Sequence, residues 1–177
     1  MKHFVKAISI IFIGAIIFSL LASFLTLPTG VLHTEVSLSQ PWLAFITALF
    51  GPIIGGAVAF FGHALTDYTT IQSFWWSWVI ANALFGILLG LATQRIRLFD
   101  GVLTLRKLVL FNIWQLIANI IAWSIIAPLG DMMIYGENRD KVFQQGFIAT
   151  GADFIAIAIF GSLAIWAYNR YWINRAK

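Results

Sequence analysis

The sequence predicts an all-α membrane protein, a six-transmembrane-helix bundle with both termini cytoplasmic. The first observation is composition, because the 177 residues are 60% hydrophobic and only 10% charged, whereas a soluble domain has roughly 25% charged residues. The second is the segment 94–107, which holds four of the eleven Lys and Arg residues between two long apolar runs. The third is a Gly51–Pro52 pair that interrupts another apolar run.

Composition also limits the function. The chain has no Cys, which excludes disulfides and thiolate metal sites. The net charge of +4 does not indicate a nucleic-acid partner, because the cations lie at predicted helix ends, where they face lipid headgroups. A zinc site needs three or four convergent ligands, and His3 lies far from the other two His residues, so we expect no metal and no cofactor. We expect one domain over 1–177.

The first helix is predicted over 7–27. An apolar run of this length, at about 1.5 Å per residue, crosses a hydrocarbon core about 30 Å thick, and it is too long for the apolar part of a signal peptide. Pro28–Thr29–Gly30 ends the run. A polar loop over 28–41 follows, and it contains His33.

The next run, 42–65, is long enough for one span, but Gly51–Pro52 lies inside it, and Pro clashes with the preceding helical turn. If 42–65 were one span, the 94–107 segment and the C-terminal tail would both lie outside, against the positive-inside rule. A turn at Gly51–Pro52, giving helices over about 38–50 and 52–66, is the better interpretation. It makes the following cations cytoplasmic: Lys2, Lys6, Arg95, Arg97, Arg106, Lys107, Arg170, Arg175 and Lys177.

Three further helices are predicted over about 74–93, 107–128 and 145–168, joined on the outer side by loops over 67–74 and 129–144. Every acid except Asp100 then lies on an outer loop or an adjoining helix end. Small residues at four-residue spacing, as in Gly86 and Gly90, let helices approach closely in lipid. On the first helix such a face could instead seat another membrane subunit, through Ala15, Ser19, Ala22 and Ser23.

Polar residues within a membrane are costly and often functional. His63 and Asp67 lie one turn apart and share a helix face near its outer end. They fit either a satisfied interfacial pair or a ligand contact at the mouth of a pocket. Trp75, Trp76 and Trp78 are typical of an aromatic belt at the headgroup level. Tyr68, Phe74 and Trp76 could also stack on a flat ligand.

Amides and one carboxylate supply the other candidates. Asn112, Gln115 and Asn119 form one stripe that faces the bundle interior. Hydrogen bonding between helices explains Asn112, which is nearer the cytoplasm, whereas Asn119 is a better ligand candidate, as is Asn82. Asp153 lies two turns into the last helix, and an unpaired carboxylate there needs a partner such as a ligand group. It is the strongest single candidate.

Catalytic motifs are absent from the sequence. There is no HExxH and no phosphate-binding loop, so the chain cannot hydrolyse ATP itself. A bundle with an outward-facing polar pocket is suited to capturing a molecule. The alternative is a small membrane enzyme, which would need a third polar group near His63 and Asp67, or a structural membrane subunit, which would have no outer cavity.

Two sequence stretches resemble a known family. They are Phe50–Gly51–Pro52–Ile53–Ile54–Gly55–Gly56 and Phe60–Phe61–Gly62–His63–Ala64–Leu65–Thr66–Asp67, followed by Phe74–Trp75–Trp76–Ser77–Trp78. Together with the six-helix topology, they are similar to substrate-binding (S) components of energy-coupling factor transporters. Within that family they resemble a branch linked to riboflavin or cobalamin uptake.

The resemblance implies a function and partners. Such a component binds a vitamin from outside, joins a transmembrane coupling subunit and two ATPases, and delivers the vitamin across the cell membrane of a prokaryote. It implies docking through the small face of the first helix, although Ala15-xxx-Ser19 replaces the family's Ala-xxx-Ala form. It also implies a lid and pocket formed by loops 28–41, 67–74 and 129–144. We favour cobalamin as the vitamin, over riboflavin and thiamine-type precursors.

Overall fold

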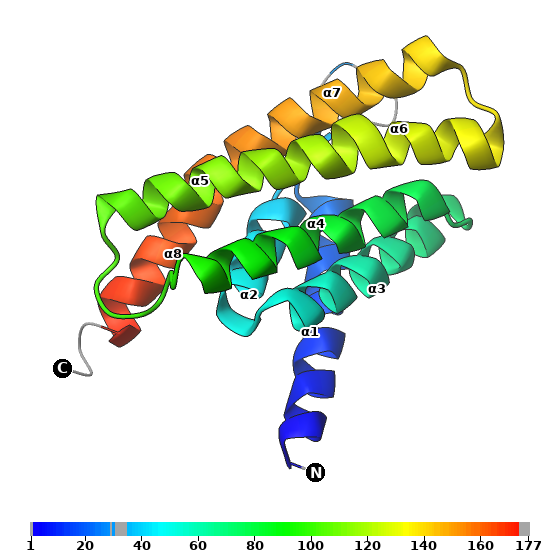
Figure 1. The fold of residues 1–177 in the computed structure, drawn as a ribbon. Helices are drawn as coiled ribbons and strands as arrows, with labels where there is room; N and C mark the ends of the chain where they lie inside the picture. The colour runs from blue at the N-terminus through cyan, green and yellow to red at the C-terminus, as the bar shows by residue number, and fades with distance from the viewer. Residues whose placement is uncertain (1, 29, 31–34, 174–177) are drawn as a thin grey trace.

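The structure, a computed structural model, describes residues 2–28, 30 and 35–173 (Figure 1). α1 (Lys2–Phe24) leads into β1 (Thr26–Pro28), which pairs antiparallel with β2 (Glu35–Ser37), so that Thr26 lies opposite Ser37. Three helices follow, α2 (Ser39–Phe50), α3 (Pro52–Ile71) and α4 (Trp76–Arg95). In Figure 1 the N-terminal part of α1 projects beyond the other helices.

Two long helices, each with π-helical segments, form the second half of the chain, and Figure 1 shows them side by side. The first, which we call the α5–η2 helix, comprises α5 (Leu105–Asn119), η1 (Ile120–Ile126), α6 (Ala127–Gly130) and η2 (Asp131–Tyr135). The second, the α7–η4 helix, comprises α7 (Arg139–Ala156), η3 (Ile157–Gly161), α8 (Ser162–Tyr168) and η4 (Asn169–Ile173).

The protein is a helical membrane protein. Within the described chain, four helices are long and apolar enough to cross a bilayer, and they cover Phe4–Phe24, Trp76–Arg95, Leu105–Tyr135 and Arg139–Trp172. Each of the six predicted helices has a counterpart in the structure. α2 has only 12 residues, which is short for a span, so the number of spans remains a prediction. The side of the membrane on which the termini lie also remains a prediction.

The predicted turn at Gly51–Pro52 is confirmed, since α2 ends at Phe50 and α3 begins at Pro52. Gly51 has a φ of 85°, a conformation that residues with a side chain rarely adopt. A Cβ there would also lie 2.5 Å from the side-chain nitrogen of Gln94 on α4. Pro52 occupies the first position of α3, where its fixed φ suits a helix and its missing N–H needs no partner.

The predicted loop over 129–144 is wrong. The α5–η2 helix continues to Tyr135 and α7 begins at Arg139, so only residues 136–138 connect the two. Pro128 and Gly130 lie inside the helix, where π-helical turns and packing against neighbouring helices accommodate them. The loop predicted over 67–74 is also shorter, because α3 extends to Ile71. The loop over 28–41 is partly the β1–β2 hairpin, and α1 ends at Phe24.

Small residues bring the helices into close contact. A Cβ on Gly86 of α4 would lie 2.7 Å from the carbonyl oxygen of Gly55 on α3. A Cβ on Gly62 of α3 would lie 2.8 Å from the ring of Phe18 on α1. These approaches place α3 between α1 and α4, as expected for small-residue interfaces in lipid.

The bundle has two chemically different ends. We call the end that carries residues 72–75 and 136–138 the turn end. The opposite end, which we call the cationic end, carries the 96–104 connection and the last turns of the α7–η4 helix (Figure 1). Its described cations are Arg95, Arg97, Arg106, Lys107 and Arg170.

Candidate functional site

A buried carboxylate at the turn end ties the beginning of α4 to the end of the α5–η2 helix. Asp131, which is 2% exposed, accepts the indole N–H of Trp75 at 2.6 Å and the hydroxyl of Ser77 through Oδ1. Its Oδ2 accepts the indole N–H of Trp78 at 2.8 Å. Hydrogen bonds to an ionised group are strong, and a carboxylate is favoured beside a helix N-terminus. Asp131 therefore fixes the first turn of α4.

The connection between α3 and α4 is fixed from a second side by Asp67. Its Oδ2 accepts the backbone N–H of Trp75 at 2.9 Å. The hydroxyl of Tyr135 accepts the backbone N–H of Trp76 at 2.8 Å, and its ring stacks on Trp75 with centroids 4.5 Å apart. The turn end is thus held by two acids and one tyrosine.

His63 completes a closed set of contacts. Its Nε2 lies 3.6 Å from Oδ1 of Asp67, and its ring centroid lies 6.3 Å from that of Trp123. The Trp123 and Trp78 rings are 5.3 Å apart. The set is closed because Trp78 and Trp75 both bond to Asp131, and the backbone N–H of Trp75 bonds to Asp67. We call this set the indole cluster: His63, Asp67, Trp75, Trp78, Trp123 and Asp131.

Several polar atoms near this cluster are buried without a hydrogen-bond partner in the described part of the chain. Five lie in the half toward the turn end or at the middle of the bundle. They are Gln40 Oε1, His63 Nδ1, Asn82 Nδ2, Asn119 Oδ1 and Trp123 Nε1. A buried polar atom normally has a partner, so this group needs an explanation.

Two amides show how these atoms are presented. Asn82, which is fully buried, accepts the side-chain N–H of Gln40 at 3.2 Å, leaving its own Nδ2 without an acceptor. Asn119 donates through Nδ2 to the carbonyl and Oε1 of Gln115, at 2.9 and 2.8 Å. Since both partners of Nδ2 are acceptors, the orientation of the Asn119 amide is fixed, and Oδ1 remains free to accept.

Asp153 is buried, with 6% of its surface exposed, and no hydrogen bond or ion pair of its side chain occurs among the residues that the structure describes. One turn before it, Thr150 bonds to the hydroxyl of Ser124 at 2.7 Å and to the carbonyl of Asn119 at 3.4 Å. Thr150 and Asp153 are three residues apart on α7, so they share a face. Asp153 is therefore on the side of α7 that meets the α5–η2 helix.

The remaining predicted ligand contacts lie elsewhere. Tyr68 is 60% exposed and Trp76 is 41% exposed, and both rings stack on Phe74 at the surface of the bundle. This arrangement is typical of an aromatic belt. Their role in binding remains a prediction, and His33 lies outside the described residues.

The predicted docking face on α1 is only partly accessible. Ala15 and Ser19 are buried against the chain's own helices, at 5% and 6% exposure, whereas Ala22 and Ser23 are half-buried. Their role in docking remains a prediction. A large residue at Ser19 would disturb packing within the bundle, so that substitution cannot test docking by itself.

Sequence reasoning did not include four residues of this region in the candidate site: Gln40, Trp78, Trp123 and Asp131. A signal for two of them existed, since Gln115, Asn119, Trp123, Ala127 and Asp131 recur every four residues. Successive members of this series share a helix face, but assigning 129–144 to a loop hid its continuation to Asp131.

The chemistry of the site suits binding. Asp131 and Asp67 each accept hydrogen bonds from the protein that hold the fold. No group of three His, Asp or Glu residues in the described ranges is placed to hold a metal ion. The site instead combines flat aromatic faces with single donors and acceptors, the composition of a ligand pocket.

Comparisons with known proteins agree with this description. The model of the family described as "ECF-type riboflavin transporter, S component" matches residues 2–170. No solved structure matches the chain.

Curated relatives cover nearly the whole chain. A UPF0397 protein from Leuconostoc citreum is 47% identical over 164 residues, which are 93% of this chain and 87% of the relative. A UPF0397 protein from Lactobacillus johnsonii is 44% identical over 93% of this chain and 89% of its own length. One from Staphylococcus aureus is 41% identical over 98% of this chain and 94% of the relative. The chain therefore belongs to the family of S components of ECF-type riboflavin transporters.

Proposed function

We propose that this chain is the membrane-embedded substrate-binding subunit of an importer in the cell membrane of a prokaryote. It captures a vitamin at the turn end of the bundle, which faces the outside. Family membership supports the transport role. The chain is not an enzyme, and a transmembrane coupling subunit and two ATPases supply the ATP-driven step, because the sequence has no phosphate-binding loop.

One observation carries the proposal: the five buried, unpartnered polar atoms around the indole cluster. Each unmatched buried donor or acceptor costs about 1–3 kcal/mol. A bound molecule with complementary groups would recover that free energy for five such atoms in one region. The atoms come from α2, α3, α4 and the α5–η2 helix, so a ligand that bonds to them would lie between these helices.

Riboflavin is the vitamin that we favour. The description of the matching family names riboflavin. The flat ring system of this vitamin suits the aromatic faces of Trp78, Trp123 and His63. The Trp123 centroid lies 5.3 Å from that of Trp78 and 6.3 Å from that of His63. The ring edge of riboflavin carries both donors and acceptors, which match Asn82 Nδ2 and Asn119 Oδ1. Thiamine-type precursors share this flat shape.

Cobalamin remains the second candidate. The sequence contains eight Trp residues, which could surround a bulky macrocycle. Such a ligand requires the turn end to open, because a Cβ on Gly130 would already lie 2.7 Å from Ser77, so α6 and α4 are in close contact.

The experiment is a titration of the purified full chain with riboflavin, cyanocobalamin and thiamine in turn, with tryptophan fluorescence as the readout. We expect saturable one-to-one binding of riboflavin. Trp123→Phe keeps a ring but removes the free N–H, so it should weaken riboflavin binding roughly tenfold. Trp172→Phe, at a position 72% exposed, is the matched control and should leave the affinity unchanged. Binding of cyanocobalamin alone would favour the second candidate, and no binding of any vitamin would refute the proposal.

A further inference from the structure

A surface groove runs along the α5–η2 helix and the α7–η4 helix toward the cationic end. It consists of two adjoining hollows of about 280 and 500 Å³ that share Leu108. The first is lined by Leu108, Val109, Asn112, Ile113, Leu116 and Phe154. The second is lined by Leu108, Ala158, Ile159, Ser162, Leu163 and Trp166. Neither hollow includes a residue of the indole cluster, so this groove is separate from the vitamin site.

The floor of the groove is suited to an apolar occupant. Its two polar side chains satisfy each other, because Asn112 donates to the hydroxyl of Ser162 at 3.0 Å and to the carbonyl of Leu108 at 2.9 Å. The walls are exposed aliphatic side chains such as Ile113 and Leu163. An occupant therefore contacts hydrocarbon, and the two polar side chains of the groove already have hydrogen-bond partners.

The length of the groove matches one leaflet. From Leu108 to Leu116 the helix rises about 12 Å, and from Phe154 to Trp166 about 18 Å. The hydrocarbon of one leaflet is about 15 Å thick, half of the roughly 30 Å core. One extended acyl chain therefore fits along the groove, beginning at the headgroup level beside Trp166.

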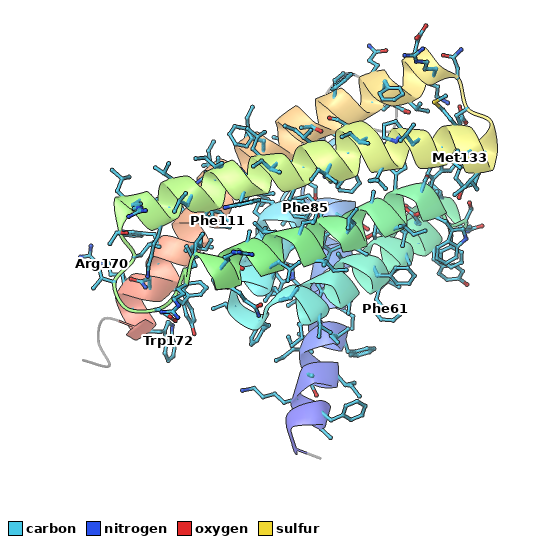
Figure 2. The ribbon with its side chains drawn as sticks, viewed as in Figure 1. Phe61, Phe85, Phe111, Met133, Arg170 and Trp172 are labelled. Atoms are coloured by element: carbon cyan, nitrogen blue, oxygen red, sulfur yellow. The ribbon has the colours of Figure 1, made fainter. Side chains whose placement is uncertain are left out.

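The cationic end of the groove carries positive charge. The guanidinium of Arg170 lies 5.3 Å from the Trp166 ring centroid, one turn beyond the groove. Arg106 is exposed in the first turn of α5, two residues before Leu108. Asn169 ties the α7–η4 helix to the 96–104 connection, since it accepts the N–H of Leu103 at 3.0 Å and donates to the carbonyl of Gly101 at 2.9 Å. Figure 2 shows Arg170 at the end of the bundle where α5 begins.

We propose that this groove binds one anionic phospholipid, with an acyl chain between the two long helices and the phosphate beside Arg170 and Arg106. Basic pockets between transmembrane helices are a known way of recognising anionic headgroups. The charge selects the headgroup, and the apolar walls select the chain. The site acts independently of the vitamin that the protein binds.

Native mass spectrometry of the delipidated full chain with added phosphatidylglycerol or phosphatidylcholine tests this proposal. We expect one phosphatidylglycerol to bind more tightly than phosphatidylcholine. Arg170→Gln and Arg106→Gln should each weaken phosphatidylglycerol binding about fivefold and weaken phosphatidylcholine binding less, because only phosphatidylglycerol has a net negative charge. Arg95→Gln, which removes the same charge at the same end but on α4, is the matched control and should change neither. Soluble glycerol phosphate should not bind, because it has no acyl chain.

Filling the groove tests the acyl-chain part. Ala158→Phe should reduce binding of both lipids, and Ile159→Trp, at a position 49% exposed, serves if the first variant does not fold. Equal binding of the two lipids, or equal effects of Arg170→Gln and Arg95→Gln, would overturn the proposal. Tight binding of glycerol phosphate would also overturn it, because the occupant would then be a free anion. A dimer that Ala158→Phe abolishes would overturn it as well, because the occupant would then be a second copy of the chain.

Discussion

Trp78 donates its indole N–H to Asp131 at 2.8 Å across 53 residues of sequence. Trp75 and Ser77 donate to the other carboxylate oxygen, so three side chains from one helical turn share a single acid. The aromatic rings that enclose the candidate site are therefore oriented by a residue that does not need to touch the ligand. Asp131 is a positioning residue for this site.

Asp131→Asn should destabilise the protein. It removes the negative charge and turns one acceptor into a donor that faces an indole or hydroxyl donor. Hydrogen bonds to a charged group contribute roughly 1.5–3 kcal/mol each, so we expect a loss of at least this size in the free energy of unfolding. Thermal unfolding in detergent, followed by circular dichroism, measures it.

Asp100→Asn is the matched control for that substitution. Its side chain is 72% exposed, and its ion pair with Arg97 is long, at 3.8 Å. Surface ion pairs contribute about 0–1 kcal/mol, so the melting temperature should hardly change. Equal melting temperatures for Asp131→Asn and the wild type would contradict the role of Asp131.

Gly146→Ala should destabilise the bundle. A Cβ at this position would overlap the carbonyl oxygen of Trp123, and would lie 2.8 Å from the ring of Pro128. That overpacking typically costs about 1–3 kcal/mol. Gly151→Ala, on the same helix with nothing within 4 Å, is the control and should be neutral or stabilising by up to about 1 kcal/mol. If both variants melt alike, α7 does not pack on η1 as described.

Much of the fold could be predicted from charge and helix-breaking residues. The turn at Gly51–Pro52 was predicted correctly. Only a turn there puts the cations of 94–107 and those of the C-terminal tail on the cytoplasmic side of the membrane, as the positive-inside rule requires. The continuation past Pro128 could not be predicted, since Pro and Gly usually end helices in water. Within a bundle the neighbouring helices and π-helical turns accommodate them.

The candidate site was predictable where polarity and helical spacing coincide. His63 and Asp67 were found as neighbours because they are four residues apart, and the structure places them 3.6 Å from each other. Trp123 and Gln40 were missed, because a buried Trp resembles any core residue and Gln40 lay in a predicted loop. Contacts between distant segments, such as Gln40 with Asn82, leave no periodic signal in one sequence.

The topology gives a prediction that needs no ligand. The chain has no Cys, so single cysteines introduced by Lys2→Cys, Asp100→Cys and Arg175→Cys can be tested without background. We expect none of the three to react with a membrane-impermeant maleimide in intact cells. Glu137→Cys, between the two long helices at the turn end, should react. Labelling at Asp100→Cys from outside would refute the cytoplasmic location of the cationic end.

Asp153→Ala should have opposite effects on stability and on binding. A buried carboxylate without a hydrogen bond is costly to the empty protein, so its removal should maintain or raise the melting temperature. If its oxygen binds the vitamin, the lost charged hydrogen bond of roughly 1.5–3 kcal/mol weakens affinity about 10- to 150-fold. Parallel melting curves and riboflavin titrations measure the two effects. A simple structural role would lower the melting temperature and leave the affinity alone.

Two asparagines on α5 test where the ligand lies, with Asn112 as the control for Asn119. Asn112→Ala removes an amide near the cationic end that already bonds to Ser162 and Leu108, so riboflavin affinity should stay the same. Asn119→Ala removes the free acceptor Oδ1 and should weaken binding roughly tenfold. Equal affinities of Asp153→Ala and the wild type would remove Asp153 from the site. A larger loss at Asn112 than at Asn119 would place the ligand at the cationic end, because only Asn112 lies in the groove there.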